Sequence, residues 1–149
     1  MADFLLDTVR AALKLTLSGA MDRFPDLKII LAHAGGFLPY ISYRVAPFLT
    51  NPNQPDFTAA GFQSNTDLLR RFWYDVALSS TPAGMPSLLE FADPAKIVYG
   101  SDSPFAPSPV VEFMSRALDE FKMSKSQQAA INRRNAYALV PRLEPSAAR

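Results

Sequence analysis

Three short apolar runs, each with a titratable polar residue at or near its end, place the strongest constraint on the fold of this chain. The runs are LKIILAH, which ends at His33, WYDVAL, which carries Asp75, and KIVYGSD, which ends at Asp102. A short apolar run bounded by turn residues is typical of a strand buried on both faces of a parallel sheet. Because the segments between the runs have helical spacing, the alternation predicts βαβ units and an α/β fold.

The remaining segments predict helices and one long loop. Apolar residues recur at helical spacing over residues 3–23, and Pro25 closes this pattern. Residues 51–65 are rich in Pro, Asn and Gln and predict a loop. Further helices are expected at residues 35–49, 67–71, 82–93, 108–121 and 124–139, and residues 144–149 are expected to form a disordered tail.

Composition restricts the class of protein. A chain of 149 residues with 48% hydrophobic residues is typical of one globular domain. The net charge is +1 and the basic residues are scattered, so no nucleic-acid or anionic membrane partner is expected. No apolar stretch reaches the roughly 20 residues that span a bilayer. The chain has no cysteine, which suits a reducing compartment and favours a cytoplasmic location.

The carboxyl ends of parallel strands meet at one edge of a sheet, so His33, Asp75 and Asp102 are expected to gather there. His33 is the only histidine of the chain, and it can be a ligand, a general base or a structural residue. The Ala-Gly-Gly sequence that follows it removes side-chain bulk. Either a substrate or backbone approaches closely there, or the two glycines form an ordinary tight turn.

Asp102 has two readings from its position alone. It can bind a metal ion or accept a proton, or it can cap the helix that starts near Ser108. A Ser-His-Asp triad from Ser101 or Ser103 is disfavoured, because GSDSP does not match the G-x-S-x-G nucleophile elbow. By spacing alone, Arg44 is a solvent-facing arginine near the end of a helix.

Three segments together resemble a known family. FPDLKIILAHAGGFLPYISYRV, WYDVALSS and KIVYGSDSPF are similar to the amidohydrolase-related family, which includes aminocarboxymuconate semialdehyde decarboxylase and the resorcylate decarboxylases. The resemblance covers nearly the whole chain but only the back part of the family's (β/α)8 TIM barrel. It implies that residues 1–143 are a partial, C-terminal barrel domain in which the three apolar runs are strands six, seven and eight.

The same resemblance implies the roles of individual residues. Family members carry one divalent metal ion, usually zinc or manganese, at the carboxyl ends of the strands. His33 matches a catalytic residue beside the metal-bound water, and Asp102 matches a metal ligand that also accepts a proton. Arg44 matches an arginine that binds a substrate carboxylate. The implied reaction is hydrolysis or non-oxidative decarboxylation of a small carboxylic acid.

The chain also departs from the family pattern. Members have an H-x-H or E-x-H pair on strand one and a histidine on strand five, whereas this chain has no histidine besides His33. A closed barrel takes about 250 residues. We therefore expect weak or absent metal binding by the chain alone, and open sheet edges that a complementary N-terminal half chain or a homo-oligomer covers. The alternatives are a non-catalytic half-barrel interaction module and a truncated gene product.

Overall fold

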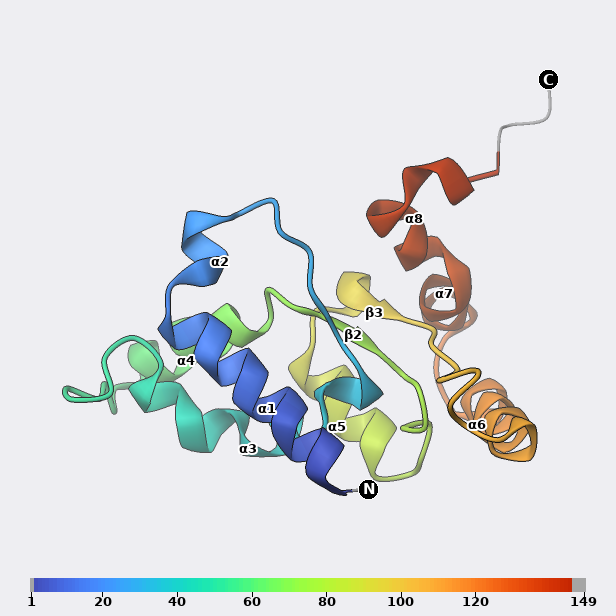
Figure 1. The fold of residues 1–149 in the computed structure, drawn as a ribbon, viewed down its shortest axis with the longest axis horizontal. Coiled ribbons are helices and arrows are strands. Elements are labelled where there is room, and N and C mark those ends of the chain that lie inside the picture. The colour runs from blue at the N-terminus through green and yellow to red at the C-terminus, as the bar shows by residue number, and fades with distance from the viewer. Residues whose placement is uncertain (1, 146–149) are drawn as a thin grey trace.

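A small parallel sheet forms the centre of the molecule (Figure 1). The structure is a computed structural model that describes residues 2–145. The strands lie in the order β1 (Ile30–Leu31), β2 (Trp73–Asp75) and β3 (Ile97–Val98). Both pairings are parallel, and Leu31 lies opposite Tyr74. The expected α/β class is therefore confirmed, although each strand is shorter than its apolar run.

Helices connect the strands and follow them. The α-helices of the described residues are α1 (Ala2–Leu17), α2 (Ala20–Arg23), α3 (Leu38–Val45), α4 (Ala59–Leu69), α5 (Gly84–Phe91), α6 (Ser108–Glu120), α7 (Lys125–Ala129) and α8 (Asn135–Leu139). Figure 1 shows α1, α3, α4 and α5 together on one side, with α6, α7 and α8 as a second group near β3. Within residues 2–145, no helix has the length and apolar character needed to cross a membrane.

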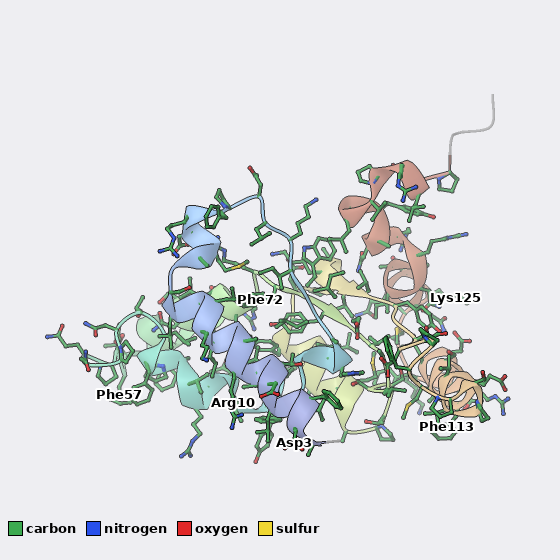
Figure 2. The ribbon with its side chains drawn as sticks, viewed as in Figure 1. Asp3, Arg10, Phe57, Phe72, Phe113 and Lys125 are labelled. Carbon is green, nitrogen blue, oxygen red and sulfur yellow. The ribbon has the colours of Figure 1, made fainter. Side chains whose placement is uncertain are left out.

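The main core lies between the sheet and the group formed by α1, α3, α4 and α5. Tyr74 of β2 is fully buried at its centre, and so is Phe72, which Figure 2 labels. The Tyr74 ring meets the Phe91 ring edge-on at 5.7 Å, and its hydroxyl donates to the Leu69 carbonyl at 2.7 Å. Burial raises the pKa of this phenol. Burying a side chain of this size contributes roughly 1.5–3 kcal/mol, so these contacts fix the sheet against the helices.

The single helix expected over residues 3–23 is wrong in one respect. The structure divides it into α1 and α2 at Gly19, whose φ of +66° lies in the left-handed region that glycine adopts without strain. The Gly19 N–H donates to the Thr16 carbonyl at 3.0 Å and ends α1. A periodic pattern of apolar residues does not register such a break.

The loop expected over residues 51–65 is also too long, because α4 begins inside it. Thr58 caps this helix, since its hydroxyl oxygen accepts a hydrogen bond from the Gly61 N–H at 3.0 Å. Asp56 in turn accepts bonds from the Thr58 N–H at 2.9 Å and hydroxyl at 2.7 Å. These two bonds lower the pKa of Asp56.

The C-terminal segment follows its prediction more closely. Residues 124–139 are helical almost throughout, but a π-helical segment, Ala130–Arg134, separates α7 from α8. This arm is tied to β3, because the Tyr99 N–H donates to the Ile131 carbonyl at 2.8 Å. Most of the expected tail, residues 146–149, lies outside the described residues.

β1 is less buried than its apolar run predicts. Ile30 is 48% exposed, whereas Trp73, its partner on β2, is only 7% exposed. β1 has a neighbouring strand on one side only, because the described residues place no strand beside its outer edge. An apolar part of the sheet surface therefore stays open to solvent at β1.

Candidate active site

The three polar residues at the strand ends come together at the carboxyl edge of the sheet. His33 follows β1, Asp75 is the last residue of β2, and Asp102 follows β3. The Asp75 carboxylate joins two of the loops, because its Oδ1 accepts hydrogen bonds from the His33 N–H at 2.8 Å and from the Ala77 N–H at 3.0 Å. This is the edge at which parallel α/β folds carry their chemistry.

The imidazole of His33 is half-buried and held by one ring nitrogen. Its Nδ1 lies 3.1 Å from the Ala77 carbonyl oxygen. A carbonyl oxygen can only accept, so this hydrogen bond requires that Nδ1 carries the proton. Nε2 is then the unprotonated, basic nitrogen of the neutral ring, and it can donate a proton when the ring is charged.

The backbone around the site is strained. The φ angles of His33, Ala34, Leu78 and Asp102 are 56°, 57°, 50° and 63°, all in the left-handed region. Each such residue costs on the order of 1–3 kcal/mol unless glycine occupies it, and it persists only where surrounding contacts hold it. The strain is found after all three strands, where the candidate side chains lie.

The two glycines after His33 accommodate the protein's own atoms. Gly35 and Gly36 have φ of +73° and +67°. A Cβ on Gly35 would lie 2.7 Å from the Tyr74 ring, and a Cβ on Gly36 would lie 2.6 Å from the Leu5 carbonyl oxygen. The structure thus shows a turn at both glycines, and in addition a close approach of the Tyr74 ring to Gly35 and of the Leu5 backbone to Gly36.

Opposing electrostatic effects act on Asp75. Partial burial raises the pKa of its carboxyl, and this effect exceeds the lowering by the N–H bonds from His33 and Ala77. The charge of His33 also lowers this pKa, while the carboxylate of Asp102 raises it. The carboxylate of Asp102 therefore acts on Asp75 across the strand ends.

Asp102 does not cap the following helix. The N-cap of α6 is Pro107, with no side-chain cap, and the Asp102 backbone carbonyl accepts a bond from the Ala106 N–H at 2.8 Å. Among residues 2–145, no hydrogen bond to the Asp102 carboxylate is formed, and none joins Ser101 or Ser103 to His33. The disfavoured serine triad is therefore not assembled among the described residues.

A pocket lies between the loop after β1 and the loop after β2. Its volume is about 330 Å³, and its walls include Phe37 from the first loop and Leu78 and Ser79 from the second. The volume is at the lower end of the range for small-molecule sites, which is about 300–1,000 Å³. Ala34, the residue next to His33, also lines this pocket.

Arg44 lies elsewhere. It is in the last turn of α3, is exposed, and lines a separate, mainly apolar pocket of about 310 Å³ with Leu13, Leu17 and Phe48. The structure brings His33 and Asp75 together and leaves Arg44 outside that group. Its role in binding a substrate carboxylate stays a prediction.

The described residues do not form a complete metal site. Across residues 2–145, no group of three or more His, Asp or Glu side chains is arranged to hold an ion. A catalytic zinc ion normally has about three protein ligands. The described residues thus do not supply three ligands in one place, although Asp102 offers a carboxylate of suitable chemistry.

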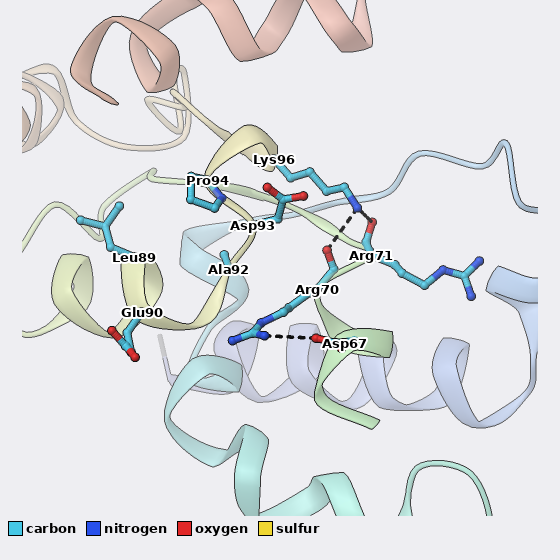
Figure 3. Close-up of a pocket in the computed structure, with 9 residues that line it drawn as sticks. All are labelled: Asp67, Arg70, Arg71, Leu89, Glu90, Ala92, Asp93, Pro94 and Lys96. Carbon is cyan, nitrogen blue, oxygen red and sulfur yellow. Dashed lines mark hydrogen bonds and ion pairs between the residues drawn. The ribbon is translucent and has the colours of Figure 1, made fainter. Parts of the chain in front are cut away.

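A larger, charged pocket of about 550 Å³ lies at the amino ends of β2 and β3 (Figure 3). Arg70 donates to Asp67 at 3.1 Å, and Lys96 donates to the carbonyl oxygens of Arg70 and Arg71 at 3.3 and 3.4 Å. Its main cationic groups are thus bonded within the protein. The position at the amino ends of the strands suits a role in stability.

Asp75 is the residue whose importance the sequence did not reveal. Its place near the end of an apolar run was visible, but nothing in its neighbourhood showed that one oxygen would join two loops. The bond to His33 spans 42 residues along the chain. The feature of the sequence that points to Asp75 is its position near the end of the second apolar run, which matches the positions of His33 and Asp102 in the first and third runs.

Comparison with known proteins identifies related sequences. The family model described as amidohydrolase matches residues 4–142. The chain is 35% identical over 144 residues to the 6-methylsalicylic acid decarboxylase of Penicillium expansum. That match covers 97% of this chain and 44% of the relative, so the chain spans less than half the length of this curated relative.

Solved structures agree with this result. An amidohydrolase II structure superposes with a TM-score of 0.78 and 26% identity, covering 92% of this chain and 42% of that one. The fold is also similar to that of a dihydroxybenzoic acid decarboxylase from Polaromonas sp. JS666, solved with manganese and 2-nitroresorcinol bound. There the TM-score is 0.74 and the identity 23%, with 93% of this chain and 40% of that one covered. The chain belongs to the amidohydrolase family.

Proposed function

We propose that this chain provides part of the active site of a metal-dependent decarboxylase that acts on a small aromatic carboxylic acid. The observation that carries the proposal is the His33 imidazole at the carboxyl edge of the sheet, whose Nδ1 is bonded to the Ala77 carbonyl and whose Nε2 is left for proton transfer. The relative from Penicillium expansum supports decarboxylation over hydrolysis.

Decarboxylation replaces a carboxylate on carbon by a proton. The carbon–carbon bond breaks, carbon dioxide leaves, and the electron pair left on the ring carbon accepts the proton. In the proposal, the protonated His33 donates this proton from Nε2 and then regains one from solvent. The role of Arg44 in binding a substrate carboxylate rests on the family resemblance alone, because Arg44 lines a pocket separate from His33.

Asp102 is proposed to be one ligand of a divalent metal ion, either zinc or manganese. Such an ion polarises oxygen atoms of a bound acid when it is present. The described residues do not complete the set of metal ligands. The other ligands are proposed to come from the rest of the barrel. No proton transfer in the proposal passes through the metal.

The placement of this segment in a larger barrel is also proposed. β1, β2 and β3 correspond to strands six, seven and eight of a (β/α)8 barrel, and residues 1–143 form the corresponding part of one domain. The remaining strands of that barrel are proposed to come from sequence other than residues 1–149, and a second copy of the chain is the alternative cover for the open edges. The absence of cysteine favours the cytoplasm as its location.

The test is a chimera in which residues 4–142 replace the matching segment of the 6-methylsalicylic acid decarboxylase of Penicillium expansum. The relative's remaining sequence supplies the rest of the barrel. With zinc or manganese added, the chimera should release carbon dioxide from 6-methylsalicylic acid. A folded, metal-loaded chimera that releases none would contradict the proposal.

A further inference from the structure

The contacts of Asp75 form a closed arrangement around His33. Asp75 Oδ1 accepts hydrogen bonds from the N–H groups of His33 and Ala77, and the Ala77 carbonyl accepts the bond from His33 Nδ1. One carboxylate oxygen thereby holds both the residue that carries the imidazole and the residue that orients it. The loops after β1 and β2 cannot move independently while these bonds persist.

The backbone held in this way is strained on both sides. His33 and Ala34 in one loop and Leu78 in the other have positive φ angles of 56°, 57° and 50°. Non-glycine residues keep such angles only where neighbouring contacts impose them, at about 1–3 kcal/mol each. The Asp75 bonds are made at His33 itself and one residue before Leu78, so they act where the strain is stored.

The space that Asp75 occupies depends on a glycine of the third strand end. A Cβ on Gly100 would lie 3.0 Å from both Cβ and Cγ of Asp75 and 3.2 Å from its Oδ2. Gly100 has no positive φ, so an added methyl group would act on Asp75 by contact alone. This glycine leaves the Asp75 side chain room to point toward the loops.

We infer that Asp75 is a positioning residue that fixes the tautomer and the direction of the His33 imidazole through its bonds to the two loops. Its role in turnover rests on the proposed function, but its effect on His33 does not. Asp75 Oδ1 acts as a hydrogen-bond acceptor and transfers no proton. The side-chain oxygen of asparagine can accept the same two bonds, whereas alanine offers no acceptor.

The experiment uses the fact that His33 is the only histidine, so a histidine-specific ¹⁵N label gives one pair of ring-nitrogen signals. At about pH 8.5 an ordinary imidazole is neutral, since its pKa is about 6.5. The unaltered chain should show Nδ1 protonated and Nε2 unprotonated. Asp75→Ala should give a mixture of the two tautomers, and Asp75→Asn should restore the original signals.

Two further variants make the outcome specific. Asp93→Ala is the matched control, because Asp93 also accepts a loop N–H, that of Ala95 at 2.9 Å, but at the opposite end of the strands. It should leave the His33 signals unchanged. Gly100→Ala should shift the His33 signals. If Asp75→Ala does not fold, the Gly100→Ala result tests the positioning role of Asp75. An unchanged tautomer in Asp75→Ala or Gly100→Ala, or its loss in Asp75→Asn, would overturn the inference.

A kinetic measurement separates this inference from the proposed function. In the chimera, Asp75→Ala should lower kcat by about 10–100-fold, as for other residues that orient a functional histidine, with KM little changed. Asp75→Asn should retain most of the turnover. If the unaltered chimera is inactive while the tautomer depends on Asp75, the proposed function fails and the positioning role stands. If the chimera is active and the tautomer of His33 does not depend on Asp75, the positioning role fails and the proposed function stands.

Discussion

At the scale of single residues, the Asp75 carboxylate is disfavoured in its ionised form, yet its Oδ1 accepts two structural hydrogen bonds. Its partial burial raises the pKa of its carboxyl even though two N–H groups and His33 lower it. The ionised form is therefore less favourable in the folded chain than in the unfolded chain. The Oδ1 of this carboxyl nevertheless accepts the two hydrogen bonds that join the loops.

The raised pKa of Asp75 predicts that the stability of the chain depends on pH. A carboxyl whose pKa is raised by folding binds more protons in the folded state, so the free energy of unfolding falls as pH rises. The fall begins near the ordinary value of about 3.9 and ends above the raised pKa of the folded state. In urea unfolding measured from acidic to neutral pH, the free energy of unfolding of the unaltered chain should fall as pH rises. In Asp75→Asn the part of this fall due to Asp75 should be absent. Equal pH dependence in the two proteins would show that Asp75 is not perturbed.

A second prediction at this scale concerns Asp102. In the chimera, Asp102→Asn should weaken metal retention, because an amide oxygen is a poorer ligand than a carboxylate. Metal content measured after dialysis should fall below that of the unaltered chimera. Asp7→Asn, at an exposed position on α1, is the control and should retain the metal. Equal retention in Asp102→Asn would exclude this aspartate as a ligand.

At the scale of elements, local hydrogen bonds determine where helices begin. α4 starts at Ala59 because the Thr58 hydroxyl accepts the Gly61 N–H and also donates to Asp56. Thr58→Ala should lower the free energy of unfolding by about 1 kcal/mol. Thr8→Ala is a suitable control, since the Thr8 hydroxyl bonds only to the Phe4 carbonyl within α1. If urea denaturation gives the two variants the same stability, Thr58 does not act as a cap.

The elements also show what could be predicted from the sequence. The parallel pairing, and the position of His33 and Asp102 after strands of the same direction, follow from local apolar runs, so they could be anticipated. The division at Gly19 could not, because α1 and α2 share one helical pattern. Nor could the Asp75 contacts, since the bond to His33 depends on how loops 42 residues apart are placed. The sequence thus placed His33, Asp75 and Asp102 at one edge of the sheet, but it did not predict the hydrogen bonds that Asp75 makes there.

At the scale of the whole molecule, the sheet ends at an open, apolar edge. Ile30 on β1 is 48% exposed, and Leu27 just before it is 47% exposed. Open strand edges promote association with other chains. The described residues that cover β3, by contrast, come from the C-terminal helical arm.

We therefore predict that the chain associates through this edge in solution. Ile30→Lys should reduce the mass measured by light scattering, because a charged residue on an edge strand opposes pairing. Phe113→Lys is the matched control, since Phe113 is 64% exposed on α6, in the group of helices near β3 (Figure 2). It should leave the mass unchanged. A monodisperse monomer before any substitution would contradict the prediction.

The function of the assembled molecule depends most directly on His33. Steady-state carbon dioxide release by the chimera, measured with its metal content, tests whether this imidazole transfers the proton. His33→Gln should lower kcat by about 10²–10⁴-fold while the metal content stays constant. Arg133→Gln, an exposed substitution in the segment Ala130–Arg134, should leave kcat unchanged. Full turnover by a folded, metal-loaded His33→Gln chimera would contradict the account and return His33 to a structural role.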